Sequence, residues 1–254
     1  LAGGLGTRIS EETSDKPKPM VQINGKPILW HLMNTFAEQG FTDFALALGY
    51  KSEVVVDWLG RLKGVKNGNR KGDLVTNFEA NDICPWNIDA IETGLNTQTG
   101  GRIAQCMGFY PGERVMATYG DGLANVSIPK LLQFHDDHGK LSTVTAVRPP
   151  ARFGYLQISD SKVIHFGEKN QSDAGWINGG YFVLEPTVAE FVSSNDEPFE
   201  AGALPRLVED SQLMAYHHYG FWQPMDTLRE KHELEKFANS SQPPWLNLEN
   251  DLDY

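Results

Sequence analysis

The chain opens on a glycine-rich run, LAGGLGTR at residues 1–8, followed by KPKPM at residues 16–20. Three glycines within four residues let the backbone adopt positive φ and bring successive N–H groups close to a ligand, which suits a cradle for phosphate oxygens. Arg8 adds a planar fork for one phosphate, and Pro17 and Pro19 hold the segment around Lys18 extended. We interpret the two segments as a clamp for a triphosphate. A plain tight loop is the alternative.

A phosphate turn of this kind normally follows the carboxyl end of a strand in a doubly wound sheet. The rest of the chain fits that class, because strand-like and helix-like patterns alternate along it. Pro27 opens a helical pattern that Gly40 is placed to end, the apolar run at residues 44–48 predicts a buried strand, and Ser52 is predicted to cap the next helix. We expect an α/β fold with a doubly wound, mostly parallel (mixed) central sheet and a small β/α extension.

The domain organisation follows from where these patterns change. We expect one domain over residues 1–240, with a nucleotide-binding part at residues 1–140 and a second part at residues 141–240, and a C-terminal tail at residues 241–254. An insertion at about residues 63–93 turns basic and Gly/Asn-rich and is predicted to form a hairpin. It could serve as a lid or a subunit contact, or it could be a plain surface loop.

Charge and composition exclude several classes of protein. The net charge of −11 argues against a nucleic-acid binder, which needs a broad basic field. No apolar run approaches the ~20 residues of a membrane span, and no charged-then-apolar leader is present, so we expect a cytoplasmic protein. Cys84 and Cys106 lie in no recognisable motif, which predicts neither disulfides nor a zinc site. Because the phosphate turn lies at the very start, we expect several apolar residues to precede Leu1 in the natural protein.

Two aspartates are candidates for holding a metal ion. Asp121 stands between Gly120 and Gly122 after a strand-like run, where open α/β sheets bind ligands and where small neighbours let a metal-bound triphosphate approach. Asp226 is a second carboxylate far along the chain. Magnesium typically takes one or two carboxylates together with phosphates and water. The alternatives are an ordinary turn at Asp121 and a helix N-cap at Asp226.

The glycine-rich run with its Thr-Arg ending, together with the Pro-Lys-Pro element, resembles the opening of the sugar-1-phosphate nucleotidyltransferases. The similarity continues through YGDG at residues 119–122, INGG at residues 177–180 and QPMDT at residues 223–227. The resemblance implies the nucleotide-diphospho-sugar transferase fold with a sugar-binding extension and Mg²⁺ as cofactor. It also implies small-molecule substrates, no nucleic-acid or membrane partner, and a homo-oligomer, with hexamers among relatives of this type.

The resemblance also assigns roles to individual residues. It makes Arg8 and Lys18 catalytic and Asp121 and Asp226 metal ligands. The residues that it places on the nucleotide are Leu1, Ala2, Gly3, Gly4, Leu5, Gly6, Thr7, Thr97, Arg102 and Gly120. Those that it places on the sugar phosphate are Gly154, Glu168, Lys169, Asn178 and Gly179. The family's Glu-Lys-Pro element ends here in Asn170. Lys169 could instead be a solvated strand-end lysine, and the glycines at residues 179–180 could mark a bulge.

The activity that the resemblance implies is transfer of a cytidylyl group from CTP to glucose 1-phosphate. An oxygen of the sugar phosphate, already ionised at neutral pH, would attack the α-phosphorus in line and expel pyrophosphate, so no general base is needed. Arg102 is predicted to read the cytosine ring, with a phosphate contact or a helix cap as alternatives. A uridylyl- or thymidylyltransferase and a non-catalytic nucleotide-sugar-binding module remain open. A nicotinamide-dependent oxidoreductase should show a third spaced glycine and an acidic residue about twenty positions on.

Overall fold

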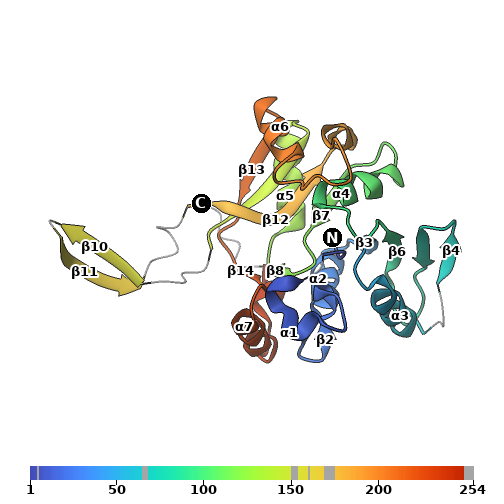
Figure 1. Ribbon diagram of the computed structural model, residues 1–254, viewed down its shortest axis with the longest axis horizontal. Helices are drawn as coiled ribbons and strands as arrows, with labels where there is room; N and C mark the ends of the chain where they lie inside the picture. Colours follow the sequence, from blue (N-terminus) through green and yellow to red (C-terminus); the bar gives the residue numbers. More distant parts are fainter. Residues whose placement is uncertain (5, 65–67, 150–153, 160, 169–174, 249–254) are drawn as a thin grey trace.

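The computed structural model describes residues 1–4, 6–64, 68–149, 154–159, 161–168 and 175–248, and its main body is two four-stranded sheets with helices packed around them (Figure 1). The description of Arg8, Lys71 and residues 154–158 and 165–168 is confined to the backbone. Among the described helices, none combines the length and the apolar character that crossing a membrane demands.

The elements follow one another along the chain as the sequence pattern suggests. The helices are α1 (Ser10–Thr13), α2 (Ile28–Ala37), α3 (Ser52–Leu62), α4 (Thr99–Gly108), α5 (Ile128–His138), α6 (Ala203–Glu209) and α7 (Leu228–Ala238), and the short 3-10 helices are η1 (Thr7–Ile9), η2 (Lys18–Met20), η4 (Pro186–Phe191) and η5 (Pro244–Leu246). The strands are β1 (Gln22–Ile23), β2 (Lys26–Pro27), β3 (Asp43–Leu48), β4 (Asn69–Lys71), β5 (Val75–Phe78), β6 (Asn87–Glu92), β7 (Val115–Thr118), β8 (Gly122–Ala124), β9 (Ser142–Val147), β10 (Gly154–Ser159), β11 (Lys162–Glu168), β12 (Ile177–Leu184), β13 (Leu213–His217) and β14 (Trp222–Pro224).

The two four-stranded sheets are mixed. One has the strand order β3-β6-β5-β4 and the other β13-β9-β12-β7. Within them, β3 runs parallel to β6 and β9 runs parallel to β13. β5 and β12 run antiparallel to both of their neighbours, which makes the share of parallel pairs smaller than the alternating pattern suggests. The α/β class with a mixed sheet is confirmed.

Several local predictions are confirmed, and two are corrected by one residue. Pro27 precedes α2 as its N-cap, and Gly40 follows the helix at φ 90°. Ser52 is the first residue of α3 and Lys51 its N-cap, so the predicted cap is wrong by one position. Thr227, not Asp226, caps α7 through a capping box with Glu230. Relative to the caps suggested by the sequence, α3 therefore begins one residue earlier and α7 one residue later.

The predicted insertion is a hairpin that extends the first sheet. β4 pairs antiparallel with β5, and β5 with β6, which itself lies beside β3. The insertion therefore supplies strands to the sheet that contains β3, and it is not a detached loop.

The core lies on the faces of the sheets. Fully buried Ile28, Leu123, Val183 and Leu234 join α2, β8, β12 and α7. A second cluster packs α3 against β3 and β6 through Val55, Leu59 and Ile88, as the helical spacing in α3 predicts. A third cluster packs α4, α6 and η4 on the other side of β12. The carboxyl ends of β3 and β7 are thereby held close to one another.

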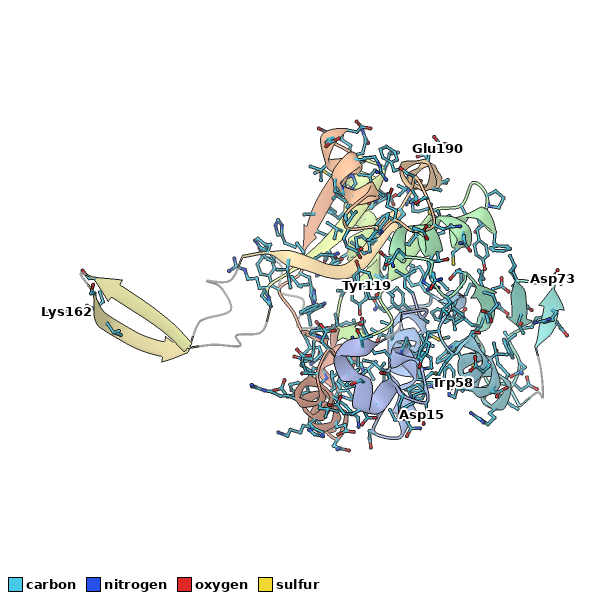
Figure 2. The ribbon with its side chains drawn as sticks, in the orientation of Figure 1. Asp15, Trp58, Asp73, Tyr119, Lys162 and Glu190 are labelled. Carbon is cyan, nitrogen blue, oxygen red and sulfur yellow. The ribbon has the colours of Figure 1, made fainter. Side chains whose placement is uncertain are left out.

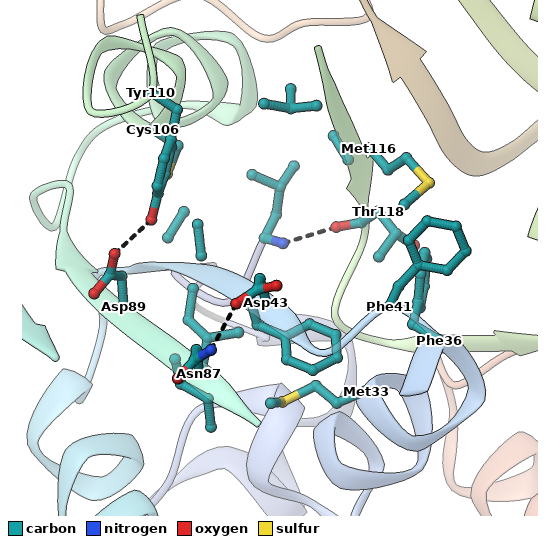
Figure 3. A pocket seen from close by; sticks show the side chains of 18 of the residues that line it. Met33, Phe36, Phe41, Asp43, Asn87, Asp89, Cys106, Tyr110, Met116 and Thr118 are labelled. Carbon is teal, nitrogen blue, oxygen red and sulfur yellow. Dashed lines mark hydrogen bonds between the residues drawn. The ribbon is translucent and has the colours of Figure 1, made fainter. Parts of the chain in front are cut away.

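A cavity of about 700 Å³ separates the facing edges of β3 and β7. Its lining includes residues 43–47 of β3 and the whole of β7, with apolar side chains such as Met33, Phe36, Phe41 and Met116 (Figure 3). At one end, the backbone nitrogen of Leu1 donates to Thr118 O at 2.7 Å. The start of the glycine-rich run therefore lies where the two edges come together.

Candidate functional site

The glycine-rich run forms a loop anchored between β3 and β7. Beside the Leu1 bond to Thr118, the backbone N–H of Ala2 donates to Ala47 O at 2.9 Å. Gly6 adopts φ 64°, and a Cβ there would lie 3.0 Å from Thr13 and 3.1 Å from Lys18. A glycine is therefore required at this turn, both for its backbone conformation and for its close approach to neighbouring side chains.

The rest of the loop fits the predicted cradle only in part of its length. Ala2 and Gly3 are buried, whereas Gly4 and Thr7 are exposed and open to a ligand. Leu5 lies outside the described residues, and of Arg8 the structure describes only the backbone in η1.

Lys18 lies between the two predicted metal ligands. Its Nζ donates to Asp121 Oδ2 at 2.6 Å and to Asp226 Oδ1 at 2.7 Å. Lys18 begins η2 after Pro17, whose φ is −72° and ψ 155°, so the predicted extended approach is present immediately before the lysine. Only 8% of Lys18 is exposed. Residues 103 and 208 positions away thus meet at one ammonium group.

The pairing of β8 with β14 explains why Asp121 and Asp226 meet. Gly122 lies opposite Pro224 in this antiparallel ribbon, and Met225 N–H donates to Asp121 O at 2.8 Å. The capping box of α7 then fixes the second aspartate, because Glu230 Oε2 accepts from the backbone N–H of Asp226 at 2.7 Å and of Thr227 at 2.9 Å. Both carboxylates are held by backbone contacts.

The charges in this cluster reinforce one another. Burial by itself lowers the pKa of Lys18, but the charges and hydrogen bonds of Asp121 and Asp226 outweigh it, and the pKa lies above its ordinary value. The lysine is therefore fully protonated at neutral pH. We use the name charge cluster for Lys18, Asp121 and Asp226.

The charge cluster is suited to a magnesium ion. Two carboxylates already converge on a positive charge, and Mg²⁺ takes one or two carboxylates with phosphate and water oxygens completing its shell. The side chains of Asp121 and Asp226 are 34% and 26% exposed, so solvent and a phosphate can reach them. Among the described residues, no group of three or more His, Cys, Asp or Glu side chains converges.

The guanidinium of Arg102 is buried among oxygen atoms of the protein. Its Nη1 donates to Leu48 O at 2.8 Å and to the Thr93 hydroxyl, and its Nη2 donates to Gly3 O at 3.0 Å and to Leu95 O at 3.4 Å. Only 4% of the residue is exposed. A Cβ on Gly3 would lie 2.2 Å from the guanidinium. Arg102 thus ties the glycine-rich loop to the end of β3, a role that its position in the sequence does not suggest.

The other two residues predicted on the nucleotide lie beside this tie. Thr97 donates its hydroxyl proton to Thr93 O at 2.5 Å, in the turn before α4. Gly120 is buried, and a Cβ there would lie 2.6 Å from Leu1 O. Both residues therefore shape the loop, and Gly120 lets β7 approach the chain at Leu1.

Strand β12 carries a bulge that packs against Tyr119, two residues before Asp121. Its register with β9 shifts between Asn178 and Phe182, and Gly180 has φ 80°. A Cβ on Gly180 would lie 2.4 Å from the ring of Tyr119, and one on Gly179 would lie 2.6 Å from Val147. Both the bulge and the close approach that the glycines suggest are present.

Tyr119, beside β12 in the middle of the molecule (Figure 2), joins this strand to α4. Its hydroxyl accepts from Asn178 Nδ2 at 3.1 Å and donates to Glu200 Oε1. Burial and the neighbouring Glu200 raise the pKa of Tyr119 far above its usual range. The sequence does not predict Glu200, because this residue lies in a turn with no recognisable motif. The only sequence feature that marks it is its position directly after Phe199, an apolar residue that is buried in the structure.

The predicted sugar-phosphate residues of the β10–β11 hairpin are not brought to the charge cluster. Gly154 pairs with Glu168 at the base of this hairpin, which stands apart from both sheets in Figure 1. Each hairpin strand pairs with the other, so backbone pairing does not hold them against the body of the protein. Lys169 lies outside the described residues, and so does the side chain of Glu168.

The cavity between β3 and β7 is separate from this chemistry. Gly120 and Leu1 line its end, but Lys18, Asp121 and Asp226 do not line it. The hydrogen bonds drawn in Figure 3 are Leu1 to Thr118, Asn87 to Asp43, and Tyr110 to Asp89. The candidate functional site is therefore the charge cluster with the glycine-rich loop, and not the large cavity.

Known proteins with similar sequences and structures identify the family of this chain. The family model described as Nucleotidyl transferase matches residues 1–238. The chain is 41% identical over 254 residues to the glucose-1-phosphate cytidylyltransferase of Salmonella typhi, covering 98% of each chain. It is 38% identical over 250 residues to the probable glucose-1-phosphate cytidylyltransferase of Bacillus subtilis (strain 168), covering 96% of this chain and 97% of the relative.

Solved structures share the fold at low sequence identity. HddC from Yersinia pseudotuberculosis superposes with a TM-score of 0.66 at 24% identity, over 93% of this chain and 97% of that one. A UDP-glucose pyrophosphorylase complexed with UDP-glucose superposes with a TM-score of 0.64 at 17% identity, over 92% and 94%. The matches confirm the fold predicted from the glycine-rich turn and the alternating elements. With its full-length sequence matches, the chain belongs to the nucleotidyl transferase family.

Proposed function

We propose that this protein transfers the cytidylyl group of CTP to glucose 1-phosphate, giving CDP-glucose and pyrophosphate. The observation that carries the proposal is the similarity over nearly the whole chain to glucose-1-phosphate cytidylyltransferases of two bacteria. The structure adds a buried ammonium group held between two carboxylates beside a glycine-rich loop. This arrangement suits a triphosphate with its metal ion.

In the proposed reaction, the glycine-rich loop and Arg8 bind the triphosphate, and Lys18 neutralises negative charge that builds up on its phosphates. A phosphate oxygen of the sugar substrate attacks the α-phosphorus in line, the bond to the bridging oxygen breaks, and pyrophosphate leaves. Lys169 is proposed to hold the attacking phosphate, and Gly154, Glu168, Asn178 and Gly179 the sugar side. Catalysis rests on positioning and charge compensation, because the attacking oxygen is already ionised.

Asp121 and Asp226 are proposed to hold Mg²⁺ through their carboxylates, with the remaining ligands from phosphate and water. When bound, the ion would neutralise charge on the triphosphate.

Because both aspartates would serve one ion, Asp121→Asn and Asp226→Asn should each weaken magnesium dependence, and the double variant should lose little more than the worse single variant. Magnesium titrations of turnover compare the wild type, the two single variants and the double variant in this double-mutant cycle. Strictly additive losses would assign the two carboxylates to separate sites.

Release of pyrophosphate tests the activity directly. We expect kcat/KM with glucose 1-phosphate to be highest for CTP, compared with UTP and dTTP. A preference for UTP or dTTP would overturn the cytidylyl assignment while leaving a nucleotidyltransferase. Tight nucleotide binding with no pyrophosphate release from any triphosphate would instead indicate a non-catalytic binding module.

We also propose that the protein works in the cytoplasm as a homo-oligomer, with a hexamer as the assembly to test. Val163 and Ile164 on the β10–β11 hairpin are 55% and 58% exposed, which suits a contact with another copy. Light scattering coupled to size exclusion should report a mass several times that of one chain. A monomer at micromolar concentration would contradict this.

A further inference from the structure

A chain of hydrogen bonds crosses from the sugar-side strand to the nucleotide-side helix. Asn178 Nδ2 donates to the Tyr119 hydroxyl at 3.1 Å, and that hydroxyl donates to Glu200 Oε1. From the other side, the hydroxyl of Thr99, at the start of α4, donates to Glu200 Oε2 at 2.7 Å. Glu200 therefore links β12 to the start of α4 through hydrogen bonds.

Donor and acceptor accounting fixes the direction of each bond. Asn178 Oδ1 accepts from the backbone N–H of Gly180 at 2.8 Å, so its amide group must point Nδ2 towards Tyr119. Thr99 Oγ1 accepts from the N–H of Phe199 at 2.8 Å, which leaves its own proton for Glu200. The carboxylate of Glu200 thus receives one bond on each oxygen and is held in place from two sides.

Glu200 keeps acceptor capacity facing solvent. An ionised carboxylate offers about four lone-pair sites, and the bonds from Tyr119 and Thr99 account for two of them. Glu200 and Asn178 are both exposed. Hydroxyl groups suit such an oriented acceptor, because each can donate a charge-assisted hydrogen bond.

The position of the network places it on the sugar side of the charge cluster. Tyr119 lies two residues before Asp121, and its ring packs on Gly180 in the bulge of β12. Trp222, on the strand that leads to Asp226, donates through Nε1 to Gly179 O at 2.8 Å. The same bulge therefore touches the segments that carry both aspartates and the segment that orients Glu200.

We propose that Glu200 accepts hydrogen bonds from hydroxyl groups of the sugar 1-phosphate, and that Tyr119 positions its carboxylate for this. This role rests on the proposed function, since it requires a sugar phosphate beside the charge cluster. It makes Glu200 a specificity-determining residue supplied by the body of the protein, in addition to the residues of the β10–β11 hairpin.

Equilibrium binding of CDP-glucose and of CDP separates the sugar from the nucleotide. In calorimetric titrations, Glu200→Gln should weaken CDP-glucose binding by about tenfold and leave CDP binding unchanged. Tyr119→Phe keeps the ring on Gly180 but removes the hydroxyl, and it should weaken CDP-glucose by a smaller factor. Glu209→Gln, an exposed carboxylate on α6, is the matched control and should bind both ligands as the wild type does.

Sugar analogues identify the hydroxyl group concerned. Among monodeoxy analogues of glucose 1-phosphate, at least one should lower kcat/KM in the wild type, and that penalty should vanish in Glu200→Gln. Equal weakening of CDP and CDP-glucose in Glu200→Gln, or no weakening of either, would overturn the role of Glu200. A wild type that binds no CDP-glucose and forms none would overturn the proposed function itself, which is a different result.

Discussion

Lys18 neutralises a pair of carboxylates that would otherwise repel each other at close range. Its ammonium contacts Asp121 and Asp226 from a nearly buried position, and both contacts raise its pKa. A charge that is held in place before the substrate arrives costs no reorganisation during the reaction. Lys18 balances the two carboxylates in the structure, and in the proposed reaction the same charge would stabilise the phosphates.

Lys18→Met should lower turnover by about 10²–10³-fold, the usual loss when one such charge-stabilising donor is removed. Initial rates of pyrophosphate release check this, with circular dichroism to confirm folding. Lys16→Met is the matched control, since Lys16 lies two residues earlier and its ammonium lies 3.7 Å from Asp15. Equal rates for Lys18→Met and the wild type would remove Lys18 from the reaction.

Arg102 shows how far a single residue can be predicted from sequence. The sequence predicts that it reads the base, and the structure shows that its guanidinium donates to carbonyls of Gly3, Leu48 and Leu95. Such partners depend on how distant loops fold together, and no local pattern specifies them. A buried guanidinium with several protein acceptors orders the surrounding loops. Removing it withdraws one donor from each carbonyl, although Gly3 O still accepts from Tyr50 N–H and Leu48 O from Thr93.

Arg102→Lys should lower kcat/KM for CTP and UTP by a similar factor of about ten and also lower the melting temperature, because a lysine cannot reproduce the planar fork. Kinetics with both nucleotides and thermal unfolding measure the two effects. Arg61→Lys, on the exposed face of α3, is the control. A selective loss of the CTP preference, with unchanged stability, would restore a direct contact between Arg102 and the base.

At the scale of elements, the capping box of α7 serves the site as well as the helix. Glu230 is buried and accepts from the N–H groups of Asp226 and Thr227, so the turn that starts the helix also orients a proposed metal ligand. The sequence QPMDT with a Glu three residues after Thr227 predicts a helix start, but the alternative cap at Asp226 could be decided only with the backbone in view.

Glu230→Ala should raise the magnesium concentration needed for half-maximal activity several-fold, because Asp226 loses the acceptor that fixes its backbone. A magnesium titration of turnover measures this shift. Glu233→Ala lies on the same helix and removes only an exposed pair with Arg229, so it should leave the titration unchanged. If both variants shift alike, the effect comes from helix stability and not from Asp226.

Across the whole molecule, the order of strands and helices could be predicted well, and the spatial arrangement of the site only in part. The run at residues 44–48, the helix after Pro27 and the glycines of β12 carry local signals of periodicity, caps and close packing. The meeting of Asp121 with Asp226 depends on the β8–β14 ribbon, whose two short strands lie about 100 residues apart and carry little pattern. The resemblance to the family predicts that Asp121 and Asp226 meet, because it assigns both residues as ligands of one metal ion.

The facing edges of β3 and β7 have a dynamic consequence. The glycine-rich loop bonds to Ala47 on one edge and Thr118 on the other, so CTP bound at this loop should slow amide hydrogen exchange on both strands together. Exchange resolved by mass spectrometry tests this coupling, and protection gained on one edge alone would contradict it. The glycine-rich loop would then be the connection through which a bound nucleotide reduces the mobility of both sheets.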